Sequence, residues 1–199
     1  MRSVLKCAAV VALVLMASEP SFSGNISGTI KARGAKNGAN AVIYIDSVQG
    51  KKFAPPKEHP TMDQKDLTFR PHVLPVVVGT TVEFLNSDNV LHNVFSPDGC
   101  TGKFNLGSWP KGKTKAFTFK EPGCMATLLC NVHPEMEGFV VVVPTPYFSV
   151  SDKDGSYVIK DVPPGKYTLR IWHEKLKGKE ISVEVPAKGD ITTDFEIHK

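Results

Sequence analysis

The sequence of 199 residues has little that would form a helix or cross a membrane. Its one long continuous apolar run, Cys7 to Ala17, is too short to span a bilayer as a helix. Beyond it there is no sustained helical periodicity, and short alternating or β-branched runs recur between clusters of Gly, Pro, Asn and Asp. We therefore expect an all-β protein built as β-sandwiches.

Strong charge and closely spaced His pairs are also missing. The formal net charge of +4 is mild, and the Lys-rich segments 111–115 and 175–179 carry no interleaved aromatic residues, so no nucleic-acid partner is expected. The six His residues include no His-x-His pair, and the C-terminal part has no His-Glu-x-x-His or His-x-x-Glu zinc motif. These absences argue against an enzyme.

The N-terminus has the pattern of a secretory signal peptide. Arg2 and Lys6 precede the apolar run, and the small residues around Ser23 suit cleavage after that position. A signal peptide over residues 1–23 predicts export to the periplasm, with no membrane insertion once it is removed. A retained membrane anchor is the weaker alternative.

The segment from Cys130 to Met136, Cys-Asn-Val-His-Pro-Glu-Met, places a thiolate, an imidazole and a thioether at three-residue intervals. Three extended residues span at most about 10 Å, so the segment must curl if its donors share one metal, and Pro134 suits such a turn. Two imidazoles, one thiolate and a weak axial Met suit copper. The segment therefore predicts a copper site that needs a second His, whereas a buried Cys near a surface His and a core Met is the alternative.

A candidate for that His lies upstream. Val82 and Phe84 alternate with polar neighbours as in a half-buried strand, an Asn-Ser-Asp-Asn cluster predicts a turn, and His92 begins the next extended run. The pattern Val-x-Phe-x-Asn followed by His-Asn-Val resembles the first ligand loop of the small cupredoxins, plastocyanin and amicyanin. Cys-x2-His-x2-Met is similar to the short ligand loop of amicyanin, and Gly138 to Val142 resembles the last strand of that fold.

The resemblance covers residues 62 to 144 and has implications for the metal. It implies that His92, Cys130 and His133 bind one copper ion equatorially and that Met136 is the axial ligand. Asn93 would hydrogen-bond across the two ligand loops and hold them in register.

Three residues depart from the better-known members of the family. Leu129 stands where several cupredoxins have an aromatic residue before the Cys, which affects any electron route through a ring. Glu135 and Glu137 flank the Met, so a carboxylate in the axial position is an alternative to the thioether.

The remaining cysteines of the mature chain predict a disulfide. If Cys130 binds copper, Cys100 and Cys124 form a pair that an exported protein would oxidise, closing a loop that stabilises by about 3 kcal/mol. The spacing from Cys124 to Cys130 does not fit the Cys pair of a binuclear centre, so we expect a mononuclear site. His59 and Met62, near His72, form a weaker candidate site, with loop and packing roles as the favoured interpretation.

The C-terminal residues 145–199 resemble a different family. Asp-x-Asp-Gly-x-Tyr at residues 152–157 and Pro-Pro-Gly-x-Tyr-x-Leu at 163–169 are similar to the carboxypeptidase regulatory-like β-sandwich, a transthyretin-like fold. The first strands of that family resemble residues 28–30 and 38–45, at the other end of the chain. We expect residues 24–50 and 145–199 to fold together around a Greek-key cupredoxin domain at 51–144, with two tandem units as the alternative. The strand pairing of Val42 to Ile45 distinguishes the two arrangements.

Within the cupredoxin segment five strands are predicted. They are Val76 to Leu85, Val90 to Ser96, Ala116 to Phe119, Met125 to Leu129, and Phe139 to Val143.

These observations predict an exported mononuclear type 1 (blue) copper protein that shuttles single electrons between periplasmic redox partners. His133 would form the exposed edge, and the contacts with its partners would be transient. The candidates for an apolar docking patch around it are Phe95, Leu106, Trp109 and Pro110. For Phe95 and Leu106, core packing is the alternative. We expect a monomer. A copper-binding or chaperone protein without electron transfer is the alternative, although the chain lacks the exposed Met or His clusters that such carriers use.

Overall fold

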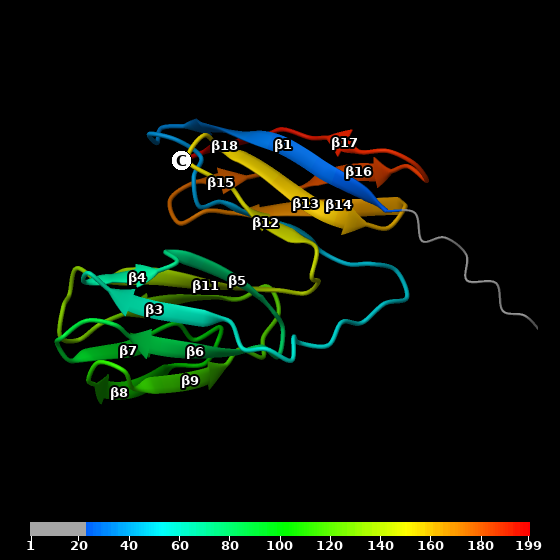
Figure 1. Ribbon diagram of the computed structural model, residues 1–199. Coiled ribbons are helices and arrows are strands. Elements are labelled where there is room, and N and C mark those ends of the chain that lie inside the picture. The colour runs from blue at the N-terminus through cyan, green and yellow to red at the C-terminus, as the bar shows by residue number, and fades with distance from the viewer. Residues whose placement is uncertain (1–22) are drawn as a thin grey trace, which may run out of the picture.

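The computed structural model describes residues 23–199, and every regular element among them is a strand (Figure 1). The all-β prediction is confirmed. Eighteen strands form four sheets, which stack as two sandwiches. In the part of the chain described, no helix is long and apolar enough to cross a membrane. The predicted signal peptide lies outside the described residues except for Ser23.

The central sandwich comprises the two sheets of residues 61–143. One sheet has the order β5 (Val73–Val77), β11 (Glu137–Val143), β10 (Met125–Leu129), β7 (His92–Ser96) and β8 (Phe104–Trp109). The other has the order β4 (Thr68–Arg70), β3 (Thr61–Lys65), β6 (Thr81–Asn86) and β9 (Thr114–Thr118). Alternate side chains of β6 point inward, as a strand period of two requires, so Val82 and Phe84 enter an aromatic-rich core between the sheets.

One predicted strand was wrong. The run Val76 to Leu85 is divided between β5 and β6, which belong to different sheets. Gly79 has a φ of 87°, and the N–H of Thr80 donates to the carbonyl of Val77 at 3.1 Å, so a tight turn separates two apolar runs that read as one in the sequence. The strand Met125–Leu129 is confirmed with its predicted bounds. β7 and β11 differ from the predicted strands by two residues at the start, and β9 differs by two at the start and one at the end.

The accessory sandwich combines the two ends of the chain. Its outer sheet has the order β13 (Ser156–Val162), β1 (Gly24–Arg33), β18 (Phe195–His198) and β15 (Lys177–Gly178), and β17 (Ile191–Thr192) also pairs with β1. Its inner sheet has the order β12 (Phe148–Val150), β2 (Val42–Ile45), β14 (Gly165–Trp172) and β16 (Ile181–Val185). A separate apolar core fills the space between these sheets.

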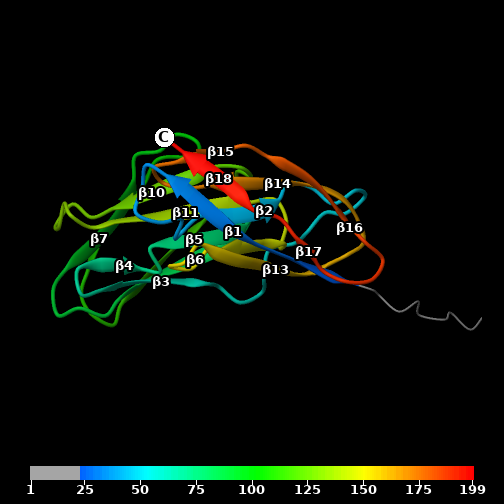
Figure 2. The same cartoon turned by 90° about the horizontal axis from the view of Figure 1, so that it is seen from above.

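The pairing of β1 and β2 distinguishes a nested from a tandem arrangement. Figure 2 shows β1 and β18 side by side, although they lie at opposite ends of the sequence. β2 pairs with β12 and β14, and among the described residues it pairs with no strand of the central sandwich. This is the pattern expected when one sandwich is inserted between the first two strands and the rest of another.

The two sandwiches pack face to face. One buried cluster joins Val42 of β2 to Val73 of β5 and to Phe139 and Val141 of β11, and Trp172 packs against it. The Phe139 and Trp172 rings are 5.3 Å apart. The accessory sandwich therefore covers the face of the central sandwich that β5 and β11 form.

Candidate metal centre

Three connections meet at one end of the central sandwich. They are the β6–β7 loop before His92, the β10–β11 loop from Cys130 to Met136, and the two-residue turn between β3 and β4. β3 runs parallel to β6, and β10 is antiparallel to both β7 and β11, so these connections emerge on the same side. Residues that are far apart in the sequence are thereby brought together.

The side chains of His92, Cys130 and His133 converge at this end. His92 Nδ1 lies 3.2 Å from His133 Nδ1, and Cys130 Sγ lies 4.0 Å from the first nitrogen and 3.9 Å from the second. His92 and Cys130 are buried, whereas His133 is half-buried. Among the described residues this is the one group of His, Cys and carboxylate side chains close enough to share a metal ion.

The spacing of the three donor atoms fits one metal ion. A point equidistant from the corners of this triangle lies about 2.2 Å from each of them, close to the roughly 2.0–2.3 Å of metal–imidazole and metal–thiolate bonds in proteins. Two imidazoles and a thiolate are the trigonal donor set of blue-copper centres. The residues present therefore fit copper.

Met136 lies in the same buried cluster as Cys130 and is 1% exposed. Its N–H donates to the carbonyl of His133 at 3.0 Å, which curls the loop between these two residues. Glu135 and Glu137 on either side are both exposed. Burial thus separates the thioether from its carboxylate neighbours and favours Met136 over Glu135 or Glu137 as the residue that would join the three donors.

Asn93 connects the two ligand loops. Its Oδ1 accepts the N–H of Asn131 at 3.3 Å, and its own N–H points to Cys130 Sγ at 3.4 Å. Its Nδ2 donates to Asn105 Oδ1 at 2.8 Å and to the carbonyl of Gly107 at 2.9 Å, so the amide is itself held by β8. The N–H toward sulfur is of the kind that stabilises a thiolate.

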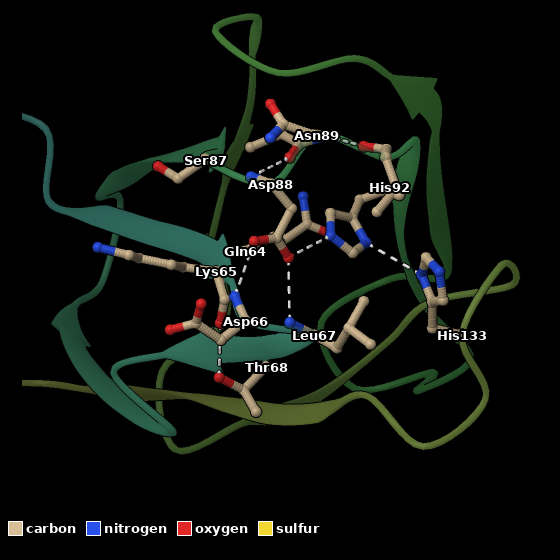
Figure 3. A network of polar contacts seen from close by, with 12 residues as sticks. Gln64, Lys65, Asp66, Leu67, Thr68, Ser87, Asp88, Asn89, His92 and His133 are labelled. Carbon is tan, nitrogen blue, oxygen red and sulfur yellow. Dashed lines mark hydrogen bonds and ion pairs between the residues drawn. The ribbon is translucent and has the colours of Figure 1, made fainter.

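Asp88 contacts the candidate centre and was not predicted from the sequence. Its Oδ2 lies 2.9 Å from His92 Nε2, on the side of the ring away from His133 (Figure 3). Burial alone would raise the pKa of Asp88, but the Leu67 N–H, the His92 ring and the Asp66 N–H outweigh it and lower the pKa from 3.8 to about 2. The group is therefore a carboxylate at neutral pH.

The signal for Asp88 in the sequence is a carboxylate four residues before a His, within a cluster that reads as an ordinary turn. Asp and Asn are common in turns because they bond to their own backbone. Asp88 instead accepts N–H groups from the β3–β4 turn, which lies beside it because β3 and β6 pair. The residues around Asp88 in the sequence therefore do not predict its contact with the β3–β4 turn.

The Cys100–Cys124 disulfide is confirmed, with the Cα atoms 5.6 Å apart. β7 and β10 pair at Phe95 and Leu129, and the two cysteines continue the same register away from the ligands. The bond therefore joins the strands that lead to His92 and Cys130, at the end opposite the candidate centre.

The weaker candidate site does not assemble. His59 Nδ1 contacts Glu83 Oε1 at 3.2 Å, Met62 is fully buried in the central core, and His72 Nε2 contacts Glu174 Oε2 at 3.3 Å. Each of the three has its own environment, in agreement with loop and packing roles.

Residues 57–143 match the family model described as copper binding proteins of the plastocyanin/azurin family. Among solved structures, a reduced amicyanin mutant is similar at 28% identity, with a TM-score of 0.41, covering 45% of this chain and 91% of the other. A purple cupredoxin from Nitrosopumilus maritimus is similar at 28% identity and a TM-score of 0.37, covering 42% of this chain and 98% of the other. A copper-containing nitrite reductase from Thermus scotoductus SA-01 is similar at 27% identity and a TM-score of 0.42, covering 51% of this chain and 25% of the other. No curated protein matches the chain.

Proposed function

We propose that the protein is an exported mononuclear blue copper protein whose residues 57–143, which match the family model of the plastocyanin/azurin copper binding proteins, form a cupredoxin domain. It shuttles single electrons between periplasmic redox partners. His92, Cys130, His133 and Met136 would hold the copper ion. The observation that carries the proposal is the triangle of donor atoms, which has room for one ion at bonding distance from all three.

The surroundings of the donors suit electron transfer. Copper bound here supplies a one-electron Cu(I)/Cu(II) couple whose potential depends on the thiolate and thioether. His92, Cys130 and Met136 are buried, so these side chains have little freedom to rearrange when the charge changes. Only His133 among the four reaches the surface, which makes its ring the edge through which an electron leaves.

A docking surface surrounds that edge. Most of the large apolar side chains that are exposed in the described residues belong to the loops of this end: Leu67, Val90, Leu91 and Val132, each 41–53% exposed. Trp109, a docking candidate on the sequence, is 2% exposed because it packs into the central core. Small apolar patches suit the brief contacts of redox proteins.

The accessory sandwich is proposed to be a carboxypeptidase regulatory-like domain formed by residues 24–50 and 145–199, which encloses the cupredoxin domain at 51–144. Its Asp-x-Asp-Gly motif forms a turn in which Asp152 Oδ1 accepts the N–H groups of Asp154 and Ser156, both at 2.9 Å. It covers the face of the central sandwich that β5 and β11 form. The mature protein is proposed to act as a monomer, without nucleic acid and without membrane insertion.

The decisive experiment is to add Cu(II) to the purified mature protein and to record its visible and electron spin resonance spectra. We expect an intense thiolate-to-copper charge-transfer band that disappears in Cys130→Ser. The matched control is the double variant Cys100→Ser/Cys124→Ser, which removes cysteines away from the centre and should keep the band.

A missing band in the wild type, or one that survives Cys130→Ser, would refute the proposal. Voltammetry then separates electron transfer from copper carriage. A reversible one-electron wave supports the carrier, whereas copper that passes readily to an acceptor protein without such a wave would favour a chaperone.

A further inference from the structure

The turn between β3 and β4 has a backbone conformation that its residues do not favour by themselves. Asp66 has a φ of 54° and Leu67 a φ of 56°. Two-residue hairpin turns with both φ values positive prefer Asn-Gly, and the left-handed conformation costs a residue such as Leu about 1–2 kcal/mol. Interactions outside the turn must therefore stabilise it.

The two backbone N–H groups of the turn both donate to a single carboxylate. The N–H of Asp66 donates to Asp88 Oδ1 at 2.8 Å, and the N–H of Leu67 donates to Asp88 Oδ2 at 3.0 Å. On its other side, the N–H of Asp88 donates to Asn86 Oδ1 at 2.9 Å. The Asp88 side chain is only 15% exposed, so both of its oxygens are held by the backbone with little competition from water.

The remaining contact of this carboxylate is with His92. Figure 3 shows Asp88 between Leu67 and the His92 ring, with His133 on the far side of that ring. The Asp88 carboxylate has no hydrogen to donate and accepts hydrogen bonds from all of its partners. In the contact with the ring, Nε2 of His92 therefore carries the hydrogen. In a neutral imidazole Nδ1 then has a free lone pair, and this is the atom that faces His133 and Cys130.

We infer that Asp88, held by the backbone of the β3–β4 turn, is a positioning residue for the copper centre that fixes both the tautomer and the orientation of His92. The inference rests on the proposed function, because it assigns His92 Nδ1 as the copper-binding atom. Partners of this kind raise the basicity of a ligand, and their removal typically lowers metal affinity about 10–100-fold. The His92 ring is fully buried, so water does not reach it to replace that contact.

The first test uses the copper-free protein. Nitrogen-15 spectra of its histidine side chains at neutral pH should show His92 as the Nε2–H tautomer. Asp88→Asn, whose amide has one acceptor oxygen where the carboxylate has two, should lose this preference, and Asp88→Glu should restore part of it. Asp66→Asn is the matched control, because it neutralises a carboxylate in the same turn but keeps the backbone N–H. An Nδ1–H tautomer in the wild type, which requires no variant to fold, would overturn the inference.

The second test measures the transfer of bound Cu(II) to excess EDTA. We expect Asp88→Asn to bind copper about 10–100-fold more weakly, with a changed electron spin resonance spectrum, and Asp66→Asn to stay within about twofold of the wild type. Equal affinity and equal spectra for Asp88→Asn would reject the role of Asp88 while the copper proposal stood. If the wild type formed no charge-transfer band, the copper proposal would fail, and the copper-free spectra would still decide what Asp88 does to the ring.

Discussion

The central and accessory sandwiches are both all-β, but they differ in how they treat buried polar groups. In the accessory sandwich, Ser151 Oγ accepts the N–H of Ala41 at 2.9 Å, and Thr145 Oγ donates to the carbonyl of Ile45 at 2.8 Å. In the described residues, the buried side-chain atoms without a protein partner all lie in the central sandwich: Asp63 Oδ1, Gln64 Oε1, Thr101 Oγ1 and Trp109 Nε1.

This difference reflects what each sandwich has to hold in place. A buried polar atom without a partner costs about 1–3 kcal/mol, so a region selected for packing alone should avoid them. Gln64 pairs with Asn86 at the ligand end of the sheet, and Trp109 pairs with His92 itself. Two of the four unpartnered atoms therefore lie near the donor end of the central sandwich, whereas Thr101 lies beside the disulfide. The core of the accessory sandwich is built from packed apolar residues.

The largest effect on stability is expected from the accessory core. Leu169 is fully buried there, and Leu169→Ala should lower the free energy of unfolding by about 2–5 kcal/mol, since it leaves a cavity. The copper charge-transfer band of the folded protein should not change. Denaturant unfolding and absorption spectra check the two statements, and a shifted band would show that the sandwiches are not separable in the way that the comparison implies.

Loss of the disulfide should affect the central sandwich next most strongly. The double variant Cys100→Ser/Cys124→Ser should be destabilised by about 3 kcal/mol, because the unfolded chain is no longer closed over 24 residues. The loss should be visible when unfolding is followed by the copper band, since β7 and β10 lead directly to the ligands. Equal free energies of unfolding for the oxidised wild type and the double variant would contradict this expectation.

A matched pair of polar variants compares the two sandwiches most directly. Asn93→Ala leaves the N–H of Asn131 without its acceptor, and Ser151→Ala does the same to the N–H of Ala41. Each change should cost about 1–3 kcal/mol in unfolding free energy. Only Asn93→Ala should also alter the electron spin resonance spectrum of bound copper. Equal spectra for the two variants would mean that Asn93 is a structural residue like Ser151.

The smallest effect concerns the contact between the sandwiches. Burial alone would raise the pKa of Glu174, but Lys175 and His72 outweigh it and lower the pKa below its ordinary 4.5. Stability from the Glu174 carboxylate is therefore complete above pH 4.5 and is lost as the pH falls through the lowered pKa. At pH 7 the free energy of unfolding of the wild type should exceed that of Glu174→Gln by on the order of 1 kcal/mol or less. Unfolding at pH 7 and pH 3 measures the difference, and an advantage that grew on acidification would have the wrong sign.

Much of the architecture follows from local patterns. Strand alternation predicted an all-β chain, and the Cys130 to Met136 loop was identified because close donor spacing is a local property. The division of Val76 to Leu85 was missed because Gly79 is a single turn residue inside an apolar run, and only sheet pairing shows that the halves separate. Trp109 was misjudged as exposed because β8 is an edge strand whose inward face cannot be read from composition.

The sequence by itself identified three candidate donors and the metal that they suit, because a thiolate, an imidazole and a thioether within seven residues must lie close together in space. Only the tertiary structure decided how the donor side chains are oriented. Asp88 contacts the N–H groups of Asp66 and Leu67 because β3 pairs in parallel with β6, and the same carboxylate contacts the His92 ring. That pairing, like the pairing of β1 with β18 across almost the whole chain, is set by the burial of sheet faces, which no local stretch of residues encodes.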